Sequence, residues 1–80
     1  MIIKNSWEID KVEAFRLFQI VKAYEVSIQT IPGGNVIAVV LLPHNEVLET
    51  QVVPGNTPED AQRAMRLANQ LVKQLTQKSH

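Results

Sequence analysis

Cysteine is absent from the 80 residues of this chain, which excludes a disulfide framework and a thiolate zinc site. We therefore expect a cytoplasmic protein rather than a small secreted one. Eight basic and eight acidic residues leave no net charge, so binding to nucleic acid or to an anionic membrane would need a local patch. No apolar run approaches the ~20 residues of a membrane span, and the amino terminus does not read as a signal peptide.

Hydrophobic residues make up 45% of the chain, which is ample for a folded core. We expect one domain over residues 1–80, because a chain of this length supports a single small core. Residues 1–6 are expected to form either a loose tail or a short edge strand. The sequence does not decide whether Met1 to Trp7 is ordered.

The longest apolar run is Val36 to Leu42, between Gly33-Gly34-Asn35 and Pro43. Its length, its β-branched residues and its flanks favour a strand. Because residues at both odd and even positions are apolar, we expect the central strand of a sheet.

Two further segments alternate between apolar and polar residues, as half-buried strands do. They are 24–29 and 47–53, and turn residues lie on either side of the central run. The short connections favour an antiparallel meander over parallel strands.

Two segments repeat apolar residues at helical spacing. The first is 12–24, with a start at either Asn5-Ser6 or Asp10, and Trp7 is expected to pack over this start. The second follows Thr57 as the N-cap and Pro58 as the first helical residue.

The predicted fold is therefore α+β with the order α-β-β-β-α, in which a three-stranded antiparallel sheet carries two helices on one face. The other face would expose alternate apolar residues of the central strand, a candidate protein interface. The two alternatives are Ile37, Val39 and Leu41, or Val36, Ala38, Val40 and Leu42. We expect a non-enzymatic interaction module that associates with a protein partner and forms a homo-oligomer, here a homodimer.

A basic, amide-rich stripe follows the last helix at steps of three and four residues, and it supports nucleic-acid binding as the alternative function. Its residues are Arg63, Arg66, Gln70 and Lys73. The competing interpretation is a solvated helix face on which Glu59 and Arg63 form an i,i+4 pair.

No pattern in the sequence points to catalysis, to a cofactor or to a metal. The histidines His44 and His80 lack spacing to a catalytic or metal-binding partner, and Glu59 and Asp60 are explained by the start of a helix. We expect that the protein is not an enzyme.

Two families share features with the chain. The element order resembles the double-stranded RNA-binding domain, which implies RNA binding; the stretch Pro58 to Arg63 is acidic where that family carries lysines. The segment Gly55 to Ala61 resembles the strand-to-helix junction of HicB-type antitoxin domains. That likeness implies a small oligomeric protein that neutralises a partner.

Overall fold

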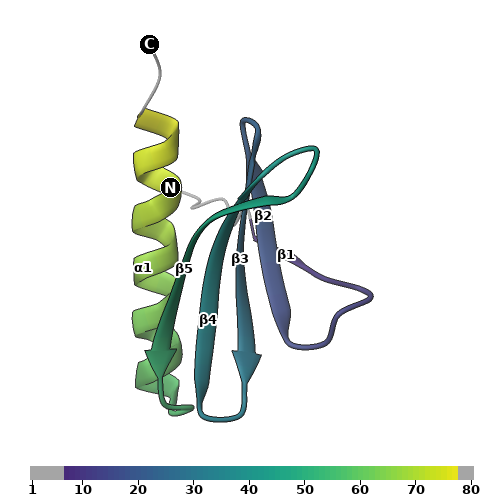
Figure 1. Ribbon diagram of the computed structural model, residues 1–80. Helices are drawn as coiled ribbons and strands as arrows, with labels where there is room; N and C mark the ends of the chain where they lie inside the picture. Colours follow the sequence, from purple (N-terminus) through teal and green to yellow (C-terminus); the bar gives the residue numbers. More distant parts are fainter. Residues whose placement is uncertain (1–6, 78–80) are drawn as a thin grey trace, which may run out of the picture.

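A computed structural model describes residues 7–77 and contains one antiparallel sheet and one helix (Figure 1). The strands are β1 (Glu8–Ile9), β2 (Arg16–Val21), β3 (Tyr24–Ile31), β4 (Gly34–Leu41) and β5 (Glu46–Pro54), and the helix is α1 (Pro58–Gln77). The strand order β1-β2-β3-β4-β5 follows the chain, so each strand pairs with its neighbours in sequence. This α+β domain is a five-stranded meander followed by a helix.

The predicted α-β-β-β-α fold is wrong, because the segment expected to form the first helix contains strands. Leu17, Gln19 and Val21 of β2 point to one face of the sheet, and Phe18 and Ile20 to the other. The same apolar residues satisfy a three- and four-residue spacing, which made the helix a plausible interpretation. Pairing of the whole of β2 with residues 24–29 of β3 gives β2 hydrogen bonds and cover that outweigh its helical pattern.

The turn between β2 and β3 consists of Lys22 and Ala23, which are not typical turn residues. Lys22 adopts a positive φ of 56°, a conformation that glycine or asparagine adopts more readily. No Gly, Asn or Asp marks this turn in the sequence. The helical spacing therefore predicts a helix that continues through the turn to Tyr24.

The other three strands were predicted close to their observed bounds, and the antiparallel meander is confirmed. The segment expected to be the central strand is β4, however, and the middle strand of the sheet is β3. A β-bulge between Val39 and Val40 shifts the register with β5. The prediction for residues 1–6 lies outside the described residues.

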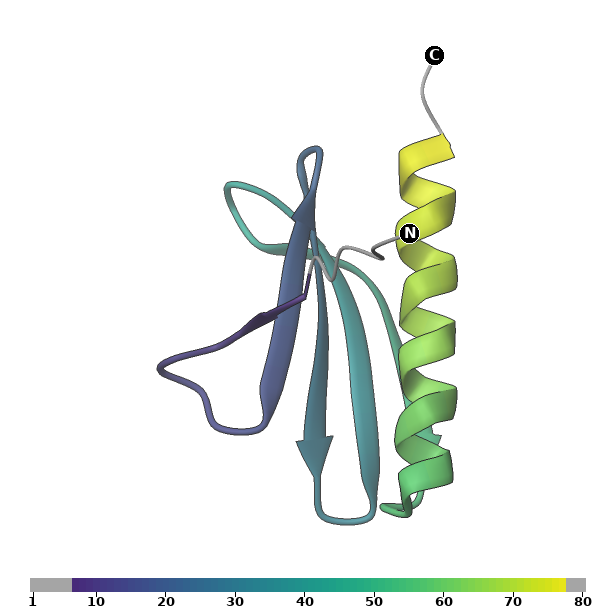
Figure 2. The same cartoon turned by 180° about the vertical axis from the view of Figure 1, so that it is seen from behind.

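Helix α1 packs along one face of the sheet, while β1 and the loop after it extend away from the helix (Figure 2). The core lies between these layers and is made mostly of small and β-branched side chains. Its buried members are Val26, Ile28, Ile37, Val39, Val53, Ala64, Ala68 and Leu71. Ala64 and Ala68 of α1 are fully buried, which allows the helix backbone to approach the sheet closely.

The start of α1 is confirmed in detail. Thr57 is the N-cap, and its hydroxyl accepts a 3.1 Å hydrogen bond from the backbone N–H of Asp60. The carboxylate of Asp60 accepts in return from the hydroxyl and the backbone N–H of Thr57, at 2.7 and 3.1 Å. This capping box satisfies backbone groups that the first helical turn leaves without intrahelical partners.

Trp7 packs against the core, and its Nε1 donates a 3.0 Å hydrogen bond to Oδ1 of Asn69 on α1. The expected contact with the start of a first helix is therefore replaced by a contact with α1, 62 residues further along the chain. Trp7 joins the amino-terminal end of the described chain to the helix.

Candidate functional site

Within residues 7–77, the sheet face opposite α1 carries no helix, and the half of it built by β4 and β5 carries no charge. Three cross-strand pairs form this surface, which we name the uncharged half-face. They are Val36 with Val52, Ala38 with Thr50, and Val40 with Val47. Two of the valines, Val47 and Val52, are each 63% exposed. An exposed apolar surface of this kind is a candidate interaction site.

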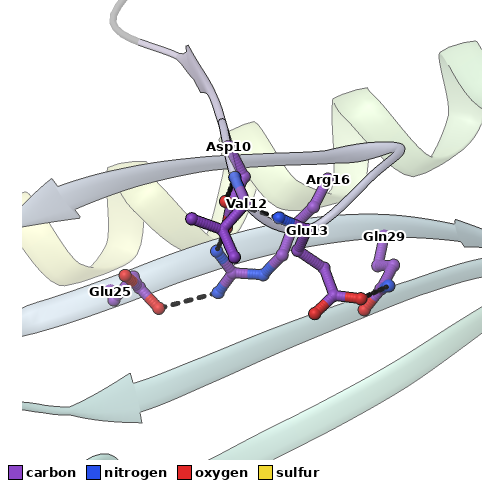
Figure 3. Close-up of polar contacts among 6 residues, drawn as sticks. All are labelled: Asp10, Val12, Glu13, Arg16, Glu25 and Gln29. Carbon is purple, nitrogen blue, oxygen red and sulfur yellow. Dashed lines mark hydrogen bonds and ion pairs between the residues drawn. The ribbon is translucent and has the colours of Figure 1, made fainter.

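The other half of this face, on β2 and β3, is organised by Arg16 (Figure 3). The guanidinium donates hydrogen bonds of 2.8 Å to Asp10 and of 2.8 Å to Glu25. Its central carbon also lies 5.6 Å from the ring centre of Phe18, within cation–π range. We name these four residues the Arg16 cluster. Its single cation is paired with two carboxylates, so the cluster carries a net negative charge.

Asp10 also shapes the loop between β1 and β2. Its Oδ1 accepts hydrogen bonds from the backbone N–H groups of Val12 and Glu13, at 2.8 and 2.9 Å. These two bonds, followed by the contact with Arg16, lower the pKa of Asp10 below its ordinary value. Burial acts to lower the pKa of Arg16, but hydrogen bonds to Glu25 and Asp10 outweigh it, and the pKa is raised. Asp10 thus caps backbone N–H groups, but it does so in a loop and not at the start of a helix.

The exposed edge of β5 is poorly suited to strand pairing with another molecule. A bulge interrupts its register next to Val40, and Pro54 removes a backbone donor at its end. Natural sheets use both devices to prevent edge-to-edge association. The half-face is therefore the better candidate for a contact surface than the edge.

The predicted interface residues Ile37, Val39 and Leu41 lie on the face that α1 covers. Ile37 is 1% and Val39 4% exposed, and Leu41 is half-buried. The predicted face is therefore corrected. Along β4 these three residues alternate with the exposed residues, so they point toward α1. Of the second alternative, Val36, Ala38 and Val40 lie on the uncovered face, whereas Leu42 lies in the turn that follows β4.

The basic stripe lies on the exposed side of α1, and the structure brings three of its four residues together. Arg63, Arg66 and Gln70 border a hollow of about 390 Å³ between α1 and β5, while Lys73 is exposed one turn further on. Arg63 forms an ion pair with Asp60. Within the described part of the chain, Arg66 has no hydrogen bond or ion pair.

Among residues 7–77, no three His, Asp or Glu side chains gather closely enough to hold a metal ion. His44 is exposed in the turn between β4 and β5, and His80 lies outside the described residues. No described helix combines the length and the apolar character that crossing a membrane would require.

Sequence reasoning missed a second surface, on the same side of the sheet as α1, to which Phe15 and Asn35 contribute. Phe15 was assigned to a helical stripe and Asn35 to a turn. The available signal was the pair Thr30 and Asn35, polar residues that flank the short turn between β3 and β4.

Comparisons with family models, with curated proteins and with solved structures found no match. The order α-β-β-β-α, on which the resemblance to double-stranded RNA-binding domains rested, is replaced by five strands and one helix. The segment Gly55 to Ala61 does join a strand to a helix. A functional assignment therefore depends on the geometry of the exposed surfaces.

Proposed function

We propose that this chain is a non-enzymatic association module that pairs with a second copy of itself through the uncharged half-face. The carrying observation is the set of three cross-strand pairs, in which Val47 and Val52 remain 63% exposed. Removing apolar surface from water is favourable by about 25 cal/mol per Å². Packing this surface against another molecule would supply that gain, because no part of α1 lies on it.

A second copy fits this surface because a twofold interface places the same patch on both sides. A charged patch would then meet its own charge, and like charges across an interface are unfavourable. The uncharged half-face avoids this conflict. In the Arg16 cluster beside it, the guanidinium is already paired with both carboxylates.

The proposed dimer has two sheets packed face to face at about 10 Å, with a helix on each outer side. Valine, alanine and threonine are small enough for the two faces to interdigitate at that spacing. A cytoplasmic location is part of the proposal, since a small secreted domain of this size would usually contain disulfides. No cofactor is required.

The test is the molar mass in solution of Val40→Glu, compared with the wild type over a range of concentrations. The wild type is expected at twice the 9.0 kDa of one chain, and Val40→Glu at one chain with an unchanged circular dichroism spectrum. Val12→Glu is the matched control, because Val12 is 96% exposed and lies outside the half-face. A monomeric wild type, or a dimeric Val40→Glu, would contradict the proposal.

Nucleic-acid binding through the basic stripe is the second candidate, and the uncompensated charge of Arg66 favours it. In that case Arg66→Glu would weaken binding to an RNA or DNA duplex without unfolding the chain. The affinity would also fall steeply with salt, because bound cations would displace counterions from the phosphates. Binding that does not depend on salt concentration, or no binding at all, would rule out nucleic-acid binding through the basic stripe.

A further inference from the structure

A groove runs between the amino-terminal half of α1 and the β1–β2 end of the sheet, on the face opposite the half-face. It has a volume of about 370 Å³, and its walls include Ile9, Phe15, Leu17 and Met65. An adjoining hollow of about 360 Å³ shares Phe15, Thr30 and Asn35 with it. Volumes of 300–1,000 Å³ with mostly apolar walls are typical of small-molecule sites. We name the two hollows together the helix-side groove.

Asn35 places a polar group in this apolar groove. It is 3% exposed, and its Oδ1 accepts a 2.8 Å hydrogen bond from the hydroxyl of Thr30. Its Nδ2 makes no hydrogen bond within residues 7–77. No fully enclosed side-chain nitrogen or oxygen in that range lacks a partner, so Nδ2 must be accessible. Because Asn35 lines both hollows, this donor faces the groove.

Two exposed apolar side chains border the groove. Phe15 is 80% exposed and Ile9 is 75% exposed. Phe15 also adopts a positive φ of 57°, which is unfavourable for an aromatic residue, and its carbonyl accepts a 2.9 Å hydrogen bond from the N–H of Thr30. The backbone therefore holds the ring beside the groove, where a ligand would cover it.

The charges around the groove favour a neutral ligand. Arg16 is the cationic residue in its lining, but it alternates with Leu17 along β2, so its guanidinium lies on the opposite face of the sheet, where it is paired with Asp10 and Glu25. Asp60, beside the lining residue Ala61, carries a carboxylate whose pKa is lowered by hydrogen bonds from Thr57. Among the described residues that line the groove, an anionic ligand would find no free cation.

We propose that the helix-side groove binds a neutral, apolar small molecule with one hydrogen-bond acceptor, such as a ketone or an amide carbonyl. The acceptor would take a hydrogen bond from Nδ2 of Asn35. The apolar part would lie between Met65 and the exposed rims of Ile9 and Phe15. This site is independent of the proposed dimer, because the two lie on opposite faces of the sheet.

The test uses Prodan, a neutral naphthalene that carries one ketone and whose emission moves to shorter wavelength in an apolar site. Titration of the full chain is expected to give a saturable shift at one probe per chain. Phe15→Glu is expected to weaken binding at least tenfold, and Asn35→Leu by about tenfold through loss of the hydrogen bond. Because Phe15 is exposed, its variant keeps the test valid even if Asn35→Leu fails to fold.

Val12→Glu is the matched control, since it adds the same charge to the same loop outside the groove. It is expected to bind Prodan like the wild type. An equal loss in both variants, or no loss in Phe15→Glu, would overturn the site. Tighter binding of the anionic probe anilinonaphthalene sulfonate would overturn the neutral ligand class. Prodan binding is also measured for Val40→Glu, the variant expected to be monomeric. Binding by this variant would show that the groove binds the probe whether or not the proposed dimer forms.

Discussion

The carboxylate of Asp60 occupies the space that a side chain at Gly55 would need. A Cβ built at Gly55 would overlap Oδ2 of Asp60, the same oxygen that accepts hydrogen bonds from Thr57. Gly55 also has a positive φ of 96°. The end of β5 can therefore pack against the start of α1 only because Gly55 has no side chain.

Gly55→Ala is expected to destabilise the chain more than Gly33→Ala. Both glycines have positive φ, but a Cβ at Gly33 would meet no atom within 4 Å. Gly33→Ala should therefore cost only the strain of the left-handed conformation, about 1–2 kcal/mol. Gly55→Ala should add displacement of Asp60 from the capping box. Urea unfolding of both variants measures the difference, and equal losses would contradict the role of Asp60.

Lys22→Gly is expected to stabilise the chain. Lys22 occupies the first central position of the β2–β3 turn with a φ of 56°, where glycine is favoured. Relief of the strain exceeds the entropy that glycine adds to the unfolded chain, so the free energy of unfolding should rise by about 0.5 kcal/mol. Thermal unfolding provides the measurement. Ala23→Gly is the control, because Ala23 does not have positive φ. A lower midpoint for Lys22→Gly would show that the turn is unstrained.

Acid is expected to destabilise the chain through Asp10 and Asp60. Hydrogen bonds from the amides of Glu13 and Val12 lower the pKa of Asp10, and those from Thr57 lower the pKa of Asp60, both from the ordinary value of 3.8. The unfolded chain then binds these protons at higher pH than the folded chain. Their contribution is complete above the ordinary pKa and is lost as the pH falls through the lowered values.

The measurement is the free energy of unfolding at several pH values, for the wild type and for Asp10→Asn and Asp60→Asn. Each variant should be less stable than the wild type near neutral pH, and the difference should shrink in acid. A difference that stays constant with pH would mean that the carboxylate charges do not contribute.

Ile37→Ala is expected to cost about 2–5 kcal/mol, the usual range for truncating a large aliphatic core residue. Ile37 is 1% exposed beneath α1. Val52→Ala removes a side chain that is 63% exposed on the other face, and it should have a much smaller effect on the free energy of unfolding at monomer concentrations. Denaturant titrations measure both free energies of unfolding. Comparable losses for the two variants would contradict the description of one face as buried and the other as exposed.

The sequence predicted α1 and three strands because these elements carry their own signals. Thr57 and Pro58 mark the helix start, and Gly33 marks the turn between β3 and β4. Strand β2 could not be predicted, since its turn at Lys22 has no turn residues and its apolar positions fit a helix equally well. Its partner β3 decides the conformation, and that information is not local.

The candidate surfaces were predictable only in part. Once β4 was recognised, alternation allowed two sets of exposed residues, and only the position of α1 distinguishes Val40 from Val39. The helix-side groove was not predictable at all. Phe15 and Asn35 meet there because β2, β3 and β4 pair in register, which depends on recognising β2 as a strand.

Helix α1 follows all five strands in the chain, and this order has a consequence for biosynthesis. A growing chain that has reached Gly55 contains all five strands but lacks the element that covers Val26 and Ile37. Until residues 58–77 leave the ribosome, both faces of the nascent sheet would expose apolar side chains, a condition that promotes aggregation. Interrupted synthesis ahead of Pro58 should therefore yield insoluble fragments, because the five strands depend on residues 58–77 to cover their apolar face.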